Sequence, residues 1–220
     1  METQNNTGLG LIKSTIERVQ NQKSLFTSAL KKLVNSSEEE IGKYLGEVKK
    51  RVLKNLALMA EILIPEVKKF IVSDKFQHRA KDEMGIKTYL YDNFASWIIN
   101  PMKGEKVSLA APLKLEKFKL EKAMHDTEIQ KELGNSGPIH ITQFLPLLWT
   151  MLVKQANGEE GDLLVNGYAN IFHVELENGP VVAVDAFWFA GDREWILDAY
   201  ELDYVYGWDD GRCFFSPASA

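Results

Sequence analysis

The spacing of apolar residues changes at Asn157-Gly158-Glu159-Glu160-Gly161, and this change constrains the fold more than any other feature. Before it, apolar residues recur every three or four positions, the period of a helix; beyond it they alternate with the period of a strand. The 220 residues are 45% apolar, enough to bury a core without disulfides or metal. We therefore expect an α+β fold, with a helical region over 1–157 and an antiparallel β region over 162–220, the latter either separate or packed with the later helices.

The first part of the chain predicts a long antiparallel helical hairpin over residues 8–72. Apolar residues keep heptad spacing from Leu9 to Leu33, and Asn35-Ser36-Ser37 then interrupts them. Ser37 and Glu40 form a capping box that starts a second helix, whose apolar stripe runs from Ile41 to Leu63. Pro65 is expected to kink or restart this helix, because proline has no amide hydrogen to donate. A hairpin of this kind suits contact with a second copy of the chain or with a protein partner.

Further helices are expected within residues 86–156. The apolar spacing indicates one from Ile86 to Ile98, one over Thr127–Leu133 and one over Ile141–Ala156. Residues 103–125 fit both periods, since Leu113 and Leu115 alternate like a strand while Leu120 and Met124 have helical spacing. We favour a helix there.

The β region predicts a meander of consecutive antiparallel strands. Asn178-Gly179 is a strong hairpin signal, and Gly191-Asp192 and Asp210-Gly211 are further turn signals. The expected strands are Tyr168–Leu176, Val181–Phe189, Glu194–Leu202, Tyr204–Trp208 and Arg212–Ser216.

Two carboxylates are candidate catalytic residues. If both of the first turns have two residues, counting outward places Asp185 opposite Asp198 and beside Phe172, whereas a three-residue turn at Ala190–Asp192 would separate them. Facing carboxylates among aromatic rings raise the pKa of one of them or hold a cation. His173 is a third candidate, on the other face beside Val184. A structural role is the commoner use of such residues.

Aromatic side chains near the end of the chain are candidate ligand-binding residues. Tyr204, Tyr206 and Trp208 alternate along a strand and share one face, where they could stack a sugar or hold a cationic ligand or basic peptide. Such stripes more often belong to a core. The histidines and the single Cys213 show no metal-ligand spacing, and no cofactor motif occurs, so we expect neither a metal nor a cofactor.

Charge divides the chain unevenly. From Gly158 onward thirteen acids face two bases, a net charge of −11, which leaves +6 for residues 1–157 out of the total of −5. Attraction between the two parts explains this better than nucleic-acid binding, for which no fold signature occurs. A single cysteine, the lack of a leader and the lack of a long apolar run lead us to expect a cytoplasmic protein with no membrane span.

The stretch from Gln155 to Gly161, with Leu163-Leu164 and Asn166 to Phe172, resembles a group of uncharacterised proteins from candidate-phylum bacteria. In that group a similar helical portion precedes a similar ending rich in tryptophan and glycine. The resemblance implies no activity and no site residues.

Two interpretations of function follow. The leading one is a non-enzymatic interaction or regulatory protein, with a helical scaffold and an acidic aromatic β module. The alternative is a small-ligand-binding protein or a hydrolase-like enzyme that uses the carboxylate pair on the sheet. A concave pocket at those carboxylates would favour the alternative, and a filled sheet with an exposed apolar helical stripe would favour the first.

Overall fold

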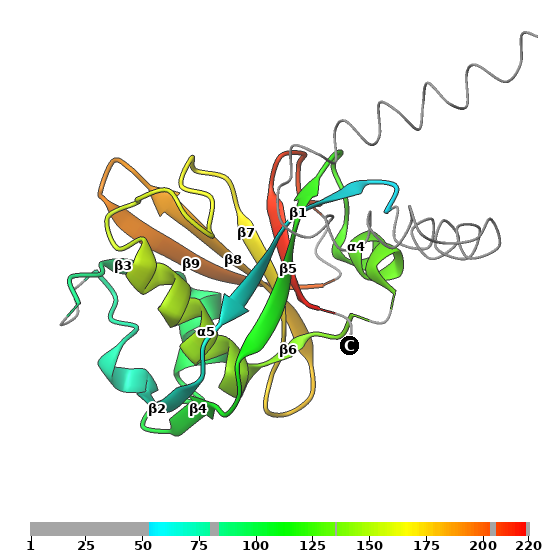
Figure 1. Cartoon of the computed structure of the whole chain (residues 1–220). Helices are drawn as coiled ribbons and strands as arrows, with labels where there is room; N and C mark the ends of the chain where they lie inside the picture. Colours follow the sequence, from blue (N-terminus) through cyan, green and yellow to red (C-terminus); the bar gives the residue numbers. More distant parts are fainter. Residues whose placement is uncertain (1–52, 80–83, 135, 203–205, 219–220) are drawn as a thin grey trace, which may run out of the picture. The chain divides into compact units, whose positions relative to one another are not determined.

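The β-branched and aromatic run of residues 181–189 forms an interior strand of a large mixed sheet in the computed structural model (Figure 1). The structure describes residues 53–79, 84–134, 136–202 and 206–218. Leu53–Ala220 form one compact unit. The architecture below is that of the Leu53–Ala220 unit.

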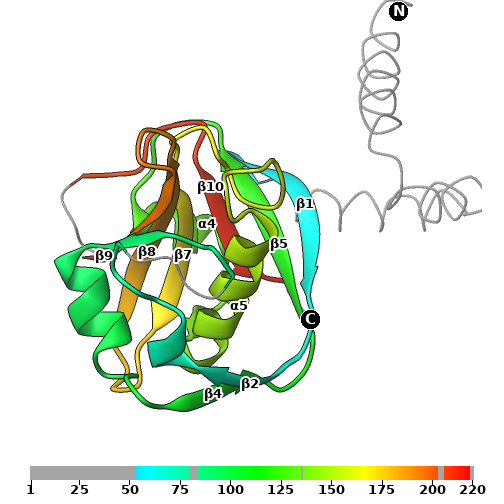
Figure 2. The same cartoon turned by 90° about the vertical axis from the view of Figure 1, so that its left-hand side faces the viewer.

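Within the described residues, eight strands make up the main sheet. Its order is β1-β5-β10-β7-β8-β9-β3, and β6 pairs with β7. The strands span Leu56–Ile64 (β1), Thr88–Leu90 (β3), Leu113–Leu120 (β5), Ile139–His140 (β6), Asn170–Glu175 (β7), Val181–Phe189 (β8), Glu194–Glu201 (β9) and Cys213–Pro217 (β10). A second sheet pairs β2 (Val67–Ile71) with β4 (Lys106–Leu109), and β4 contacts α5 (Figure 2).

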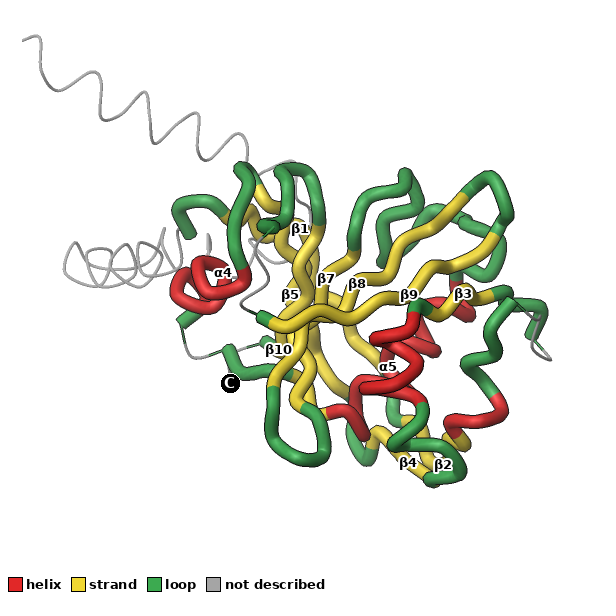
Figure 3. The backbone as a smooth tube through the Cα atoms, turned by 180° about the vertical axis from the view of Figure 1, so that it is seen from behind, coloured by secondary structure: helices red, strands yellow, loops and turns green. Residues whose placement is uncertain are grey.

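The helices of the described residues are few and short. They are α4 (Asp126–Leu133), α5 (Ile141–Lys154), the 3-10 turn η1 (Val72–Asp74) and the π-helical turn η2 (Phe94–Ile99). Figure 3 shows α4 and α5 on opposite sides of the strands. Each helix covers its own hydrophobic cluster: α5 packs with side chains such as Phe172, Val184 and Trp195, and α4 packs with Ile171, Ala183 and Phe214.

The predicted helical fold is wrong for the residues that the structure describes. Leu56–Ile64, expected in the second helix of the hairpin, is β1, because eight of its residues pair with β5 and this pairing outweighs the helical propensity of leucine, alanine and glutamate. Pro65 separates β1 from β2 instead of kinking a helix. The heptad-spaced residues 9–33 lie outside the described part of the chain.

Residues 103–125 contain the strands β4 and β5, not the helix that we favoured. The alternation of Leu113-Lys114-Leu115 continues through β5, whose partners β1 and β10 are distant in sequence. Residues 86–98 are divided between β3 and η2. The helices expected near 127–133 and 141–156 are confirmed as α4 and α5.

The first three strands of the predicted meander are confirmed as β7, β8 and β9, and the last hairpin is wrong. The strands that pair with β10 are β5 and β7, not a strand that immediately precedes it. β10 lies between β5 and β7, antiparallel to the former and parallel to the latter, so the sheet is mixed. Trp208 instead forms an isolated bridge with Met124.

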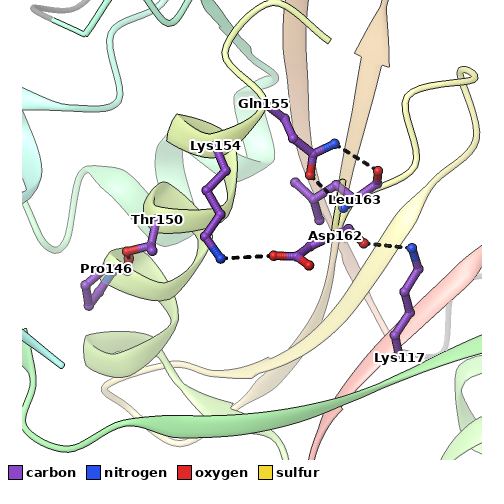
Figure 4. Close-up of polar contacts among 7 residues, drawn as sticks. All are labelled: Lys117, Pro146, Thr150, Lys154, Gln155, Asp162 and Leu163. Atoms are coloured by element: carbon purple, nitrogen blue, oxygen red, sulfur yellow. Dashed lines mark hydrogen bonds and ion pairs between the residues drawn. The ribbon is translucent and has the colours of Figure 1, made fainter. Parts of the chain in front are cut away.

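The loop after α5 is fixed to the sheet by polar contacts (Figure 4). The Gln155 side chain accepts from the backbone N–H of Leu163 at 2.8 Å and donates to its carbonyl at 3.0 Å. The Asp162 carboxylate accepts from Lys154, and its backbone carbonyl accepts from Lys117 of β5. The segment at which the apolar period changes is therefore tied to both α5 and the sheet.

Gly158 provides a test of this packing. Its φ is +75°, and a Cβ at this position would lie 2.3 Å from the Trp188 ring. We expect Gly158→Ala to lower the free energy of unfolding by roughly 2 to 4 kcal/mol, because backbone strain and overpacking add. Denaturant unfolding measures the change. Gly104→Ala is the matched control: its φ is +84° but its Cβ position is open. If Gly158→Ala and Gly104→Ala lose the same free energy of unfolding, the packing argument is refuted.

Candidate functional site

The cross-strand register of β8 and β9 places Asp185 directly opposite Asp198, as predicted. The connection from Ala190 to Arg193 has four residues and keeps the register of a two-residue turn. Asp185 is buried, with 7% of its surface exposed, whereas Asp198 is half-buried. The two carboxylates therefore share one face of the sheet but differ in their access to water.

The register between β7 and β8 differs from the prediction by one residue. The turn has three residues, Glu177, Asn178 and Gly179, since the Leu176 N–H donates to the Pro180 carbonyl. Asp185 therefore lies opposite Ile171 and not beside Phe172. The shift also moves His173 opposite Ala183, which puts it on the same face as Asp185.

A pocket of about 360 Å³ lies on this face of the sheet, the face opposite α5. Aromatic, charged and small residues line it. The aromatic residues are Phe187, Tyr200, Tyr206 and Trp208; the charged ones are Asp126, Asp185 and Arg212; the small ones are Gly167, Ala169 and Gly207.

Asp185 is the most unusual group in the pocket. Burial raises its pKa to about 7, against a smaller opposing effect of the Arg212 positive charge, and the Asp198 carboxylate raises it further. Its Oδ1 is buried and has no hydrogen-bond partner within the described part of the chain. Glu194 Oε2 also lacks a hydrogen bond there, but it lies 3.2 Å from Lys87 Nζ. A buried carboxylate oxygen without a partner costs free energy unless a ligand supplies a donor.

Asp126 joins the pocket to a buried polar network. It is the first residue of α4, and its Oδ1 lies 2.6 Å from His173 Nε2 and accepts from Trp208 Nε1 at 2.9 Å. The His173 ring also packs edge-on against Phe214, with ring centroids 4.6 Å apart. His173 thus does not line the pocket; it supports a carboxylate that does.

Asp198 supports a pocket residue in a similar way. It forms a side-chain hydrogen bond with Tyr200 and accepts from the N–H of Ala199 at 2.8 Å. Burial raises the pKa of Asp198, although both hydrogen bonds oppose the shift. Asp198 itself does not line the pocket.

The predicted aromatic stripe reaches the pocket only in part. Trp208 is buried and forms a wall, and Tyr206 is 75% exposed and lies at the rim. Tyr204 lies outside the described residues. Residues 206–208 are not a strand of the sheet.

Sequence reasoning missed Asp126 and Arg212. No local pattern links Asp126 to His173, which is 47 residues away. Arg212 had a signal, because it is one of two bases in the strongly acidic region after Gly158. Only the fold, which places Arg212 at the pocket, marks this base as part of a polar site.

No family model, curated protein or solved structure matches this chain. Within the described residues, no three histidine, cysteine, aspartate or glutamate side chains gather as a metal-binding group. No helix in that part of the chain is long and apolar enough to cross a membrane.

The raised pKa of Asp185 predicts how stability changes with pH. The pKa is higher in the folded chain than in the unfolded chain, so folding takes up protons between about pH 4 and 7 and the contribution of Asp185 to stability falls as pH rises through this range. We expect Asp185→Asn to gain stability relative to wild type across this window, by at most about 4 kcal/mol.

Denaturant unfolding at about pH 5 and about pH 8 measures this difference. Asp162→Asn is the control, because Asp162 is paired with Lys154 away from the pocket and should show no pH-dependent gain. If the free energies of unfolding of Asp185→Asn and wild type differ by the same amount at both pH values, the result would count against the burial of an uncompensated carboxyl group.

Proposed function

We propose that the Leu53–Ala220 unit binds a small molecule with a cationic head group that carries N–H donors. The observation that carries this proposal is the buried Asp185 Oδ1, which has no partner among the described residues and belongs to a side chain that lines an aromatic pocket. A charged N–H donor satisfies this oxygen, and its charge favours the ionised carboxylate. The aromatic rings offer apolar contact and attraction for a cation.

Of the two interpretations of the sequence, this proposal follows the alternative, a small-ligand-binding protein, and not the leading one, a non-enzymatic interaction protein. A filled sheet and an exposed apolar helical stripe would have favoured the leading interpretation, whereas the described residues 53–72, expected in the helical hairpin, are largely strands. A pocket that contains Asp185 is the feature that favours a ligand-binding protein. Binding is proposed here, without a chemical reaction.

We also propose a protein partner and a cytoplasmic location. Contact with a second copy or a protein partner rests on the heptad spacing of residues 9–33, which lie outside the described residues. A cytoplasmic location rests on the single Cys213, which is buried and free.

Benzamidine is a suitable probe for the pocket, because it joins a planar ring to a cation with several N–H donors. We expect benzamidine to bind the full chain and benzoate, its anionic counterpart, to bind at least tenfold more weakly. Asp185→Asn should weaken benzamidine binding by roughly tenfold or more, since it removes the charged acceptor. Isothermal titration calorimetry measures each affinity. Asp162→Asn should bind as wild type does.

The pH dependence gives the same experiment a second readout. Affinity for benzamidine should rise roughly tenfold between about pH 6 and about pH 8, as Asp185 ionises, and this rise should be absent in Asp185→Asn. Undiminished binding by Asp185→Asn, or preference for benzoate, would contradict the proposal.

A further inference from the structure

Two rings of the pocket form a corner. The Tyr200 and Trp208 ring centroids lie 5.7 Å apart and the ring planes meet at 81°. Both side chains line the pocket, and Phe187 lines it too. Rings at a right angle enclose a rounded group on two sides, and aromatic faces attract the methyl groups of an ammonium ion, which carry part of its charge.

The corner is held by hydrogen bonds to Asp126, Met124 and Asp198. Trp208 Nε1 donates to Asp126, and its backbone exchanges hydrogen bonds with Met124 at 2.8 and 2.9 Å. Tyr200 is held through its side-chain hydrogen bond with Asp198. The one donor of the indole is thus occupied, so Trp208 offers a ligand its carbon surface. The walls are fixed before any ligand arrives, which lowers the entropy cost of binding.

The charges beside the corner have both signs. Asp185 supplies one buried acceptor without a partner in the described chain. Arg212 also lines the pocket, and its Nη2 lies 2.8 Å from Oδ2 of Asp209, an aspartate whose side chain is 74% exposed. Because Asp209 is so exposed, water weakens this ion pair, and the carboxylate of a ligand can compete with Asp209 for Arg212.

From these contacts we propose that the ligand is a zwitterion with an N-methylated ammonium group, of the kind found in N-methylated amino acids. Its methyl groups lie in the corner of Tyr200 and Trp208, its one remaining N–H donates to Asp185, and its carboxylate binds Arg212. One acceptor oxygen without a partner calls for one N–H, and aromatic walls favour methyl groups over further donors. The inference rests on the proposed binding function and specifies its ligand class.

A series of four probes tests the head group on the unmodified full chain: glycine, sarcosine, N,N-dimethylglycine and glycine betaine. These zwitterions differ only in the number of methyl groups on nitrogen. Affinity should rise about tenfold from glycine to N,N-dimethylglycine as methyl groups fill the corner. It should fall again for glycine betaine, which has no N–H for Asp185. NMR titration, with the Trp208 indole N–H as a reporter, measures each affinity.

Arg212→Gln tests the carboxylate end, with 2-(dimethylamino)ethanol as a probe that lacks the carboxylate. Wild type should prefer N,N-dimethylglycine over this amino alcohol by at least tenfold, and Arg212→Gln should lose the preference. Retained benzamidine binding shows that the variant is folded and its pocket intact. A preference that survives in Arg212→Gln would overturn the role of Arg212.

The outcomes separate this inference from the proposed function. If benzamidine binds through Asp185 but affinity is flat or falls along the methyl series, the inference is overturned and the cation-binding proposal stands. If benzamidine fails to bind as well, the proposed function is overturned with it.

Discussion

The register between β8 and the strands on either side of it is the constraint on which the site depends. It sets Asp185 opposite Asp198 and Ile171, on the face of the sheet that carries the pocket. A shift by one residue would turn Asp185 toward α5 and the larger apolar cluster. Its carboxyl group would then lie among apolar side chains and away from the pocket. The register is held by a three-residue turn at one end of β8 and a four-residue turn at the other. From it follow the burial of the carboxyl group, its raised pKa and its lack of a partner in the described chain.

The parts of the fold that could be predicted are those decided by nearby residues. β7, β8, β9, α4 and α5 occur near their expected places, because turn signals and apolar periodicity are local. β1 and β5 were missed, because their pairing partners are 49 to 64 residues apart along the chain and the sequence of β1 fits both periods. The position of β10 between β5 and β7 depends on the whole sheet, and no local pattern indicates it.

The site shows the same division. Asp185 and Asp198 could be paired by counting from turns, and Tyr206 and Trp208 could be marked as a stripe. Asp126 lies at the start of α4, 47 residues from His173 and 82 from Trp208 along the chain, and meets both only through the fold. The supporting roles of His173 and Asp198 are also visible only in three dimensions: each holds a group that lines the pocket and neither lines it.

The titration of Asp185 itself tests the central claim most directly. The carboxyl carbon of Asp185, followed by ¹³C NMR in the full chain without ligand, should report a pKa of about 7. Saturation with benzamidine should then lower the midpoint, because a bound cation favours the ionised form. A midpoint close to the ordinary value of 3.8 in the unliganded chain would show that the group is solvated or already has a partner, and would contradict the account.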